Sequence, residues 1–297
     1  MKTIRIIAPA KFIDKKIVFD AKSFLENNGF RVEIGEYCLG QHYYFSGTDR
    51  ERAIDFQRAI DDDDVDIVLC ARGGYGSIRI IDKIDFTKFK KCPKPIFGFS
   101  DVTVFHNHIQ SHFGIPTVHS TTPLNFKINT NDSLQSLIDV FNGKEVSYKF
   151  GSHPQNIQGQ VTAKVVGGNL SILHSLIGTD SDVSYKGKIL FIEDLAESIY
   201  AIDRMMWGLK KSGKLQGVVG LMVGGFTDIK DTNPSFGKTL IDVVLEHVEH
   251  LKIPVCFNFP AGHIEDNRAV VLGQEATLEI YQKKVKFNQK GITELIL

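Results

Sequence analysis

The chain has 297 residues, which at about 150 residues per domain predicts two domains, each able to bury a core without disulfide bonds. Its 35 Lys and Arg residues balance 35 Asp and Glu residues, and this zero net charge argues against a nucleic-acid or anionic-membrane partner. Hydrophobic residues make up 42% and charged residues 24%, values typical of a globular protein, which excludes extensive disorder.

The cysteines and the N-terminus both favour the cytoplasm. The four cysteines lie far apart and form no CxxC pair: Cys38, Cys70, Cys92 and Cys256. We therefore expect buried thiols in a reducing compartment rather than a zinc site or a disulfide framework. Residues 8–10 mimic a signal-peptidase site, but the apolar stretch before them is short and contains Arg5, so a first strand is the better interpretation. No run approaches the roughly 18 apolar residues of a membrane helix.

The N-terminal part of the chain alternates strand and helix signals, the pattern of a doubly wound parallel sheet. Strands are expected at residues 4–8, 31–34, 67–70, 96–99 and 116–118, with helices beginning near Ile17, at Asp49 and at Asp101. We predict an α/β fold in which residues 1–124 form a mostly parallel, flavodoxin- or amidotransferase-like domain. Each polar or Gly-rich turn lies at the carboxyl end of its strand, where open α/β sheets bind ligands.

The C-terminal part is predicted to be a mixed α/β domain, residues 159–297, that is rich in short strands. Residues 125–158 are rich in Asn, Ser, Gly and Lys with little periodicity, which predicts a linker. Further elements are expected as strands at 188–192, 218–223, 270–272 and 276–281 and as helices at 199–213 and 240–248.

Ser100 directly follows an apolar strand and precedes a helix that begins with Asp101. A serine on such a tight turn is exposed at the top of the sheet, and the backbone N–H of Asp101 is free to stabilise an oxyanion. The fifth position of a GxSxG motif is Val102 rather than Gly, so the alternative that Ser100 is a simple helix N-cap stays open.

A Gly-rich loop, Arg72 to Gly76, follows the neighbouring strand. Its amides can complete an oxyanion hole or form a nest for a carboxylate or phosphate. The loop matches neither a Walker A motif nor GxGxxG, and a loop of this kind by itself is more often an ordinary turn.

A serine nucleophile needs a histidine base, and ten histidines compete for this role. His108 and His112 are four residues apart on one expected helix, a spacing that can bind a metal ion. Because no HExxH motif is present, we expect these residues, like His106, to have packing or surface roles. A solvated helix face is expected to carry His247 and His250. By contrast, His263 lies in a Pro-Ala-Gly-His loop between two expected strands, a usual place for a functional side chain.

The acid that orients the base is expected at the end of an apolar strand, at Glu193 or Asp194. Glu193 is the first charged residue after the four apolar residues 189–192. The pattern does not choose between the two carboxylates, and both can simply favour the positive end of the following helix.

Taken together, these segments resemble the LD-carboxypeptidase family of serine peptidases, including its murein tetrapeptide and microcin-immunity branches. The matching segments are Ala71–Gly76 (ARGGYG), Pro95–Thr103 (PIFGFSDVT), Gly167–Leu170 (GGNL), Gly187–Glu197 (GKILFIEDLAE), Ile202–Met205 (IDRM) and Pro260–His263 (PAGH). One departure is visible, because many relatives carry His-Gly-Pro where this chain has residues 119–123, His-Ser-Thr-Thr-Pro.

The resemblance implies a triad with Ser100 as nucleophile, His263 as base and Glu193 as orienting acid, in a cleft between the two domains. The oxyanion donors would be the backbone amides of Asp101 and of Gly73 or Gly74. No metal or other cofactor is required. In the murein branch, the bond cut lies before the terminal D-Ala of a tetrapeptide, so the partner would be a small peptide.

The resemblance leaves substrate contacts and rival functions open. Candidates for substrate binding are Arg72, Tyr75 and Arg204, and either arginine can instead form a structural ion pair. One rival is a relative that hydrolyses peptidyl or aminoacyl nucleotides, with Trp207 as an aromatic platform, although we expect Trp207 to be packed. A rival of another class is a two-domain binding protein without chemistry. A homodimer also remains open.

Overall fold

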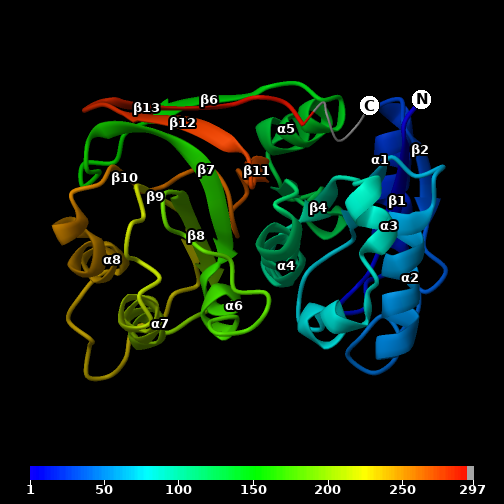
Figure 1. Ribbon diagram of the computed structural model, residues 1–297, viewed down its shortest axis with the longest axis horizontal. Coiled ribbons are helices and arrows are strands. Elements are labelled where there is room, and N and C mark those ends of the chain that lie inside the picture. The colour runs from blue at the N-terminus through cyan, green and yellow to red at the C-terminus, as the bar shows by residue number, and fades with distance from the viewer. Residues whose placement is uncertain (293–297) are drawn as a thin grey trace.

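Two β-sheets organise the protein, as a computed structural model shows for residues 1–292 (Figure 1). The first sheet has the order β11-β5-β4-β3-β1-β2, and all of its strands except β11 run parallel. Its strands are β1 (Thr3–Ile7), β2 (Arg31–Ile34), β3 (Ile67–Cys70), β4 (Ile96–Gly98), β5 (Thr117–His119) and β11 (Val270–Leu272). The strands β3, β4 and β5 are buried throughout, as expected for a parallel sheet covered on both faces.

Helices and short 3₁₀ turns connect the strands of the first sheet. They are α1 (Lys15–Asn27), α2 (Asp49–Asp61), η1 (Ser77–Arg79), η2 (Ile81–Lys83), α3 (Thr87–Lys91), η3 (Ser100–Val102), α4 (Thr103–Phe113) and η4 (Pro123–Asn125). Local sequence explains where α2 begins, because Thr48 and Glu51 form a reciprocal capping box. The helix α4 ends at Gly114, whose φ of 65° is left-handed and favours glycine.

The second sheet is mixed and has the order β10-β9-β8-β7-β12-β13-β6. Its strands are β6 (Val146–Gly151), β7 (Gly159–Asn169), β8 (Ile189–Leu195), β9 (Gly220–Thr227), β10 (Val255–Cys256), β12 (Glu275–Ile280) and β13 (Lys284–Gln289). The accompanying helices are α6 (Leu170–Ser175), α7 (Ile199–Lys211), α8 (Leu240–Val248) and the short η5 (Glu249–Leu251). The predicted fold class, a mostly parallel α/β sheet followed by a mixed α/β part, is confirmed.

The segment 125–158 is more regular than the sequence analysis expected. It contains the helix α5 (Asn131–Phe141) and the strand β6, which pairs with β13. Its polar composition conceals this helix, because α5 buries Leu137 and Phe141 while its Asn and Gln residues face solvent. The ring of Phe141 packs 4.6 Å from that of Phe97 in β4. This segment therefore joins the core instead of only connecting two parts.

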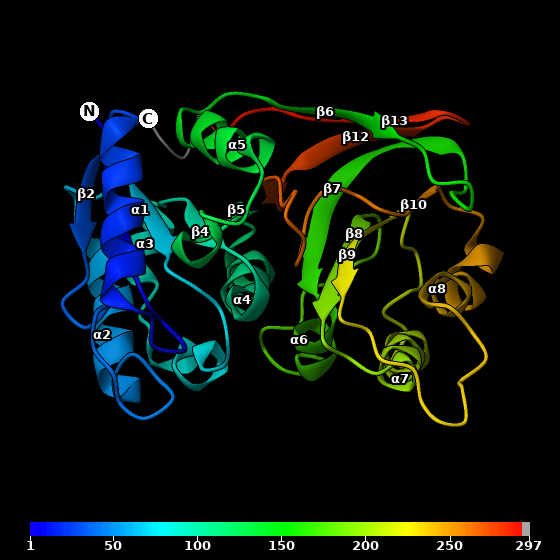
Figure 2. The ribbon, with the colours of Figure 1, turned by 180° about the vertical axis from the view of Figure 1, so that it is seen from behind.

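The two sheets share contacts that hold the functional loops in place. Seen from behind, α4 lies between the first sheet and the pair formed by α6 and β7 (Figure 2). The hydroxyl of Thr103 accepts a hydrogen bond from the backbone N–H of Asn169 at 3.1 Å, and the Asn107 amide donates to the carbonyl of Gly167 at 3.3 Å. Because β11 adds to β5, the C-terminal chain also completes the first sheet.

Some expectations about single residues need correction. The thiols of Cys38, Cys70 and Cys256 are buried as expected, but Cys92 is exposed because it follows the short surface helix α3. Trp207 was expected to be packed, yet 36% of it is exposed. Within residues 1–292, we find no helix with the length and apolar character needed to cross a membrane.

Candidate active site

Ser100 occupies a strained turn between β4 and α4. Its φ of 64° is left-handed, a conformation that costs a non-glycine residue about 1–3 kcal/mol and that clusters at functional sites. The turn is tight because Gly98 lies against Val102, where a Cβ would come within 2.9 Å of the Val102 side chain. Ser100 is not the helix N-cap, since no side-chain cap bond forms at η3 or at α4. The structure thus removes the simple N-cap alternative.

Gly73 packs directly against this turn. A Cβ on Gly73 would lie 2.7 Å from Ser100 Cβ, 3.0 Å from Ser100 Oγ and 3.1 Å from the backbone nitrogen of Asp101. Only glycine fits there, and its backbone lies beside the serine hydroxyl. Gly74 also lines the pocket but lies nearer to Lys11.

The side chain of Asp101 ties this turn to the loop after β3. It is buried, and its Oδ2 accepts a hydrogen bond from the backbone N–H of Ser77 at 2.8 Å. Burial raises the pKa of Asp101, although the hydrogen bonds from Ser77 oppose the shift. The backbone nitrogen of Asp101 lies beside the contact of Gly73 with Ser100, 3.1 Å from the position of a Gly73 Cβ.

His263 and Glu193 form a buried pair. The distance between His263 Nδ1 and Glu193 Oε2 is 2.5 Å, and Glu193 is 0% exposed. Burial alone lowers the pKa of His263, but the charge of Glu193 and the hydrogen bond to it outweigh burial and raise that pKa above its ordinary value. Because an ionised carboxylate only accepts hydrogen bonds, Nδ1 carries the proton and Nε2 presents a lone pair.

The loop that carries His263 fits closely over Glu193. Gly262 has a φ of 111°, and a Cβ there would lie 2.7 Å from Glu193 Cβ, so the approach requires glycine. The amide oxygen of Asn267 accepts from the Gly262 N–H at 2.8 Å, and Thr227 donates to the His263 carbonyl at 2.9 Å. The imidazole is further held by the ring of Phe99, whose centroid lies 4.8 Å away.

Asp194, the other acid that the sequence allowed, has different partners. Its Oδ1 accepts from the Asn169 amide at 2.9 Å, and its Oδ2 accepts from the Ser171 N–H at 2.9 Å. Burial raises the pKa of Asp194 to about 6. The structure therefore resolves the alternative in favour of Glu193 as the carboxylate that contacts His263.

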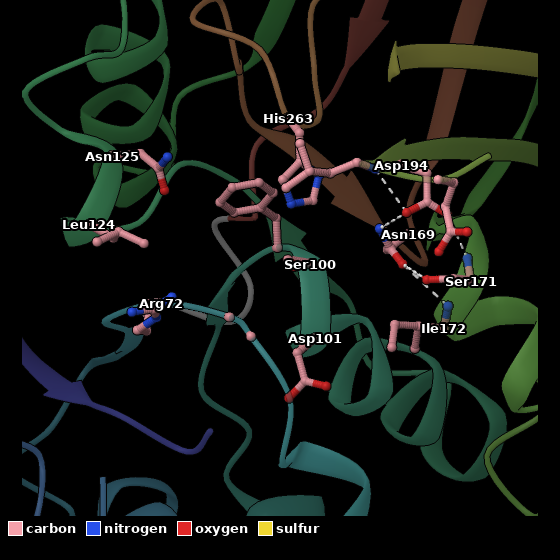
Figure 3. Close-up of a pocket in the computed structure, with 15 residues that line it drawn as sticks. Arg72, Ser100, Asp101, Leu124, Asn125, Asn169, Ser171, Ile172, Asp194 and His263 are labelled. Atoms are coloured by element: carbon pink, nitrogen blue, oxygen red, sulfur yellow. Dashed lines mark hydrogen bonds between the residues drawn. The ribbon is translucent and has the colours of Figure 1, made fainter. Parts of the chain in front are cut away.

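Ser100 and His263 line one pocket, with a cavity of about 360 Å³ (Figure 3). Arg72 lies on one side of Ser100 and Asn169, Ser171 and Asp194 lie on the other. The remaining lining residues are Gly73, Gly74, Phe99, Asp101, Leu124, Asn125, Ile172, Leu195 and Glu197. The pocket joins loops after β3, β4, β7 and β8, as expected for an α/β sheet that binds ligands at the carboxyl ends of its strands.

Two of the three candidate substrate contacts lie outside this pocket. Tyr75 is 47% exposed and faces Phe45, and Arg204 lies on α7 against the ring of Tyr200. Neither is among the pocket-lining residues, whereas Arg72 is. Sequence reasoning did not single out Asn169 or Glu197, although both stand in the quoted segments GGNL and GKILFIEDLAE.

Several other histidines are buried in the fold and have structural roles. Within residues 1–292 no group of three or more His, Cys, Asp or Glu side chains has the arrangement of a metal site. His108 Nδ1 instead contacts Ser181 Oγ at 2.9 Å, and burial lowers the pKa of His108 to about 4. The expectation of a solvated His247 is wrong, since its ring is buried 4.9 Å from that of Trp207 and 3.5 Å from Asp203.

The arrangement has the parts needed for acyl transfer by a serine. A strained, pocket-facing hydroxyl lies beside backbone amides, and the same pocket receives an imidazole whose second nitrogen is held by a buried carboxylate. These are the chemical requirements of nucleophilic catalysis, without any need for a metal ion.

Comparison with known proteins identifies matches along both parts of the chain. Residues 4–120 match the model of the LD-carboxypeptidase N-terminal domain, and residues 162–278 match that of the LD-carboxypeptidase C-terminal domain. A relative described as a probable murein peptide carboxypeptidase of Bacillus subtilis is 34% identical over 98% of this chain and 93% of its own.

Solved structures agree with this match. The muramoyltetrapeptide carboxypeptidase of Oxalobacter formigenes superposes with a TM-score of 0.88 at 28% identity, covering 97% of this chain and 99% of its own. The microcin C7 self-immunity protein MccF, solved in complex with aspartyl sulfamoyl adenosine, has a TM-score of 0.87 at 22% identity and covers 97% of this chain and 96% of its own. At that identity, the second likeness concerns the fold alone.

Proposed function

The chain belongs to the LD-carboxypeptidase family, and on that premise we propose that this serine carboxypeptidase removes the terminal D-Ala of murein tetrapeptides through Ser100, His263 and Glu193. The observation that carries the proposal is the buried contact of 2.5 Å between His263 Nδ1 and Glu193 Oε2 in the pocket that also presents Ser100. Because this contact holds Nδ1 of the imidazole, Nε2 is available to accept the proton of the Ser100 hydroxyl.

In the proposed first step, Ser100 Oγ attacks the carbonyl carbon before D-Ala while His263 Nε2 takes its proton. Glu193 accepts from Nδ1–H throughout and stabilises the imidazolium that forms. The proton then passes from His263 to the amine of D-Ala, which leaves. Water, deprotonated by His263, hydrolyses the acyl-enzyme and regenerates the Ser100 hydroxyl.

The developing oxyanion is proposed to bind the backbone amides of Asp101 and Gly73. The support is steric, since the position of a Gly73 Cβ lies 3.0 Å from Ser100 Oγ and 3.1 Å from the Asp101 nitrogen. Gly74 was an equal alternative from the sequence, but its own Cβ position faces Lys11. Backbone donors held by close packing need little reorganisation when the charge develops.

The terminal carboxylate of the substrate is proposed to bind Arg72. The guanidinium lines the pocket, donates from Nη1 to the Phe12 carbonyl at 3.1 Å and leaves its buried Nε without a partner. A fixed cation that lacks its own carboxylate favours a free terminal carboxylate over an amide, because the amide would leave the site's charge uncompensated.

The proposed triad draws its residues from both of the domains that the sequence predicts. Residues 1–124 would supply the nucleophile and residues 159–297 the acid and base, so that the pocket lies between two domains. Action in peptidoglycan recycling, a cytoplasmic location and a homodimer stay predictions from the sequence.

The test is mass spectrometry of the products after incubation with a murein tetrapeptide, its C-terminal amide and the pentapeptide ending in D-Ala-D-Ala. We expect D-Ala release from the tetrapeptide, far slower reaction of the other two, and none from the Ser100→Ala protein. Equal release of D-Ala from tetrapeptide and pentapeptide would overturn the proposal. Faster cleavage of an aminoacyl sulfamoyl adenosine would favour the nucleotide alternative, for which the structure offers less support because Trp207 does not line the pocket.

A further inference from the structure

A fully buried arginine lies behind the Gly-rich loop that follows β3. Arg52, on α2, exposes none of its side chain, which is rare for a charged residue unless it is paired. Its guanidinium forms an ion pair with Asp49 through Nη2 and donates from Nε to the Gly47 carbonyl at 3.2 Å. From Nη1 it donates to the Pro9 carbonyl and, at 2.9 Å, to the Gly76 carbonyl. Arg52 therefore joins the loops that follow β1 and β3 to its own helix.

The peptide group between Gly76 and Ser77 is bound at both of its ends. Its carbonyl oxygen accepts from Arg52 Nη1 at 2.9 Å, and its N–H donates to Asp101 Oδ2 at 2.8 Å. Because a peptide group is planar and rigid, two hydrogen bonds in opposite directions fix its orientation. Gly76 has a φ of 145°, and a Cβ there would lie 2.8 Å from Arg52 Nη1, so the contact requires glycine.

This peptide group lies between a buried cation and a buried anion. Its carbonyl oxygen points to the guanidinium and its N–H to the carboxylate, so the peptide dipole has the favourable orientation for both charges. Burial raises the pKa of Asp101, and the hydrogen bonds from Ser77 and the charge of Arg52 oppose that shift. Burial lowers the pKa of Arg52, and the charges of Asp49 and Asp101 oppose that shift. Each side chain thus favours the charged form of the other.

The same loop supplies a proposed oxyanion donor. Gly73 lies three residues before Gly76, and its Cβ position is 3.0 Å from Ser100 Oγ. Three of the five residues of the Gly-rich loop are glycines, whose backbone has little conformational preference of its own. Figure 3 shows the Asp101 carboxylate on the side of Ser100 away from His263, so this carboxylate points away from the reacting groups. Contacts outside the loop must therefore set where the Gly73 amide lies.

We propose that Arg52 and the Asp101 carboxylate fix this peptide group, and that the loop thereby presents the Gly73 amide to the oxyanion. Arg52 does not line the pocket, so it is a positioning residue and not a catalytic one. The inference rests on the proposed function in one respect, because it needs the oxyanion that forms when Ser100 attacks an acyl group. Such donors act in the transition state, so their displacement lowers kcat more than it raises KM.

The first experiment compares the wild type with Arg52→Met, which removes the guanidinium and keeps an unbranched side chain. We expect kcat for D-Ala release from tetrapeptide to fall about 10–100-fold, with KM within about threefold, because only the transition state carries the oxyanion. Arg5→Met is the matched control, since Arg5 is a half-buried arginine of the first sheet that pairs with Glu33 and Asp62. It should keep kcat within about twofold of the wild type. A folded Arg52→Met enzyme that does the same would overturn the inference.

A fluorophosphonate probe, which phosphonylates an active serine, counts the active sites and measures their reactivity. The final extent of Ser100 labelling gives the competent fraction, to which kcat is normalised, so partial unfolding does not imitate the expected loss. The labelling rate should also fall at least about tenfold in Arg52→Met, because the phosphonyl oxygen occupies the oxyanion site. Slower labelling, together with no D-Ala release by the wild type, would overturn the proposed function and leave this inference standing. Equal labelling rates would overturn the inference, whatever the turnover.

Gly76→Ala tests the same contact without removing a charge. Its Cβ would lie 2.8 Å from Arg52 Nη1, so the carbonyl has to move away from the guanidinium. Gly29→Ala is the matched control, because Gly29 also has a left-handed φ, 87°, but a Cβ there meets nothing within 4 Å. We expect kcat to fall about tenfold or more in Gly76→Ala and to stay within about twofold of the wild type in Gly29→Ala. An unchanged kcat in Gly76→Ala would overturn the inference, including the case in which Arg52→Met does not fold.

Discussion

Replacing Glu193 by Gln removes the charge that orients His263 while changing little of its volume. The carboxylate is fully buried and its Oε2 lies 2.5 Å from His263 Nδ1. A Gln amide can donate to Nδ1, which would place the imidazole proton on Nε2, where it blocks proton transfer from Ser100. We therefore expect a large loss of turnover together with a folded protein.

The size of the loss follows from the burial of the pair. Removing one partner of a buried, hydrogen-bonded charge pair costs about 3–5 kcal/mol, and in the transition state the imidazolium would lose that stabilisation. At about 1.4 kcal/mol per tenfold change in rate, kcat/KM is expected to fall by about 10²–10⁴.

The pH profile should move as well. Burial lowers the pKa of His263, and the charge and hydrogen bond of Glu193 raise it above the ordinary value. A protonated His263 cannot act as base, so wild-type activity falls as the pH drops through this raised pKa. Without the Glu193 charge, burial dominates, and the acid limb of kcat/KM is expected at lower pH than in the wild type.

The assay is D-Ala release from tetrapeptide between about pH 4.5 and 9, with Asp194→Asn as the matched comparison. Asp194 contacts Asn169 and the Ser171 N–H rather than His263, and its charge is the smallest contribution to the His263 pKa. Its variant should shift the acid limb less than Glu193→Gln does. A Glu193→Gln enzyme within about tenfold of the wild type, with an unmoved acid limb, would refute the reasoning.

Three further predictions concern single residues. Ser100→Ala is expected to reduce turnover by several orders of magnitude with little change in thermal stability, which steady-state kinetics and a melting curve check together; near-normal turnover would exclude Ser100 as nucleophile. Arg72→Ala should lower kcat/KM by about 10–100-fold for the tetrapeptide but only slightly for its C-terminal amide, and equal losses on both would argue against carboxylate binding. Gly262→Ala should destabilise the fold by about 1–3 kcal/mol in urea denaturation, because its φ is 111° and the new Cβ would lie 2.7 Å from Glu193 Cβ; an unchanged midpoint would show that the loop can move. EDTA is expected to leave the rate unchanged, and a loss restored by zinc would contradict the serine mechanism.

Local sequence signals were sufficient to predict elements and turns whose determining contacts are close in the chain. The alternation of apolar strands and amphipathic helices predicted the first sheet, and the tight turn at Ser100 followed from an apolar strand that runs directly into a helix. The same reasoning failed at α5, whose polar composition concealed a buried face with Leu137 and Phe141. It failed again at His247, because a neighbouring helix, not its own, buries the ring.

The choice between Glu193 and Asp194 shows a second kind of information that the apolar pattern of a strand does not contain. Successive residues of a regular strand point to opposite faces, so a pattern of apolar residues says little about which of two adjacent carboxylates faces a given loop. Here the register between β8 and β9 shifts between Ile192 and Asp194, and both carboxylates are buried. A β-bulge of this kind has no signature in the apolar pattern of one strand.

The sequence by itself determined the α/β class, the order of its elements, the tight turn at Ser100 and the family to which the chain belongs, because propensity, periodicity and ordered motifs are properties of the chain. The tertiary structure alone decided that Glu193 meets His263, that Arg72 lines the pocket while Arg204 does not, and that β11 completes the first sheet. Glu193 and His263 are 70 residues apart in the chain, and their contact depends on the pairing of β8, β9 and β10 within the second sheet and on a glycine that lets a loop approach within van der Waals distance. Such long-range contacts arise from the packing of the whole molecule, which no local pattern encodes.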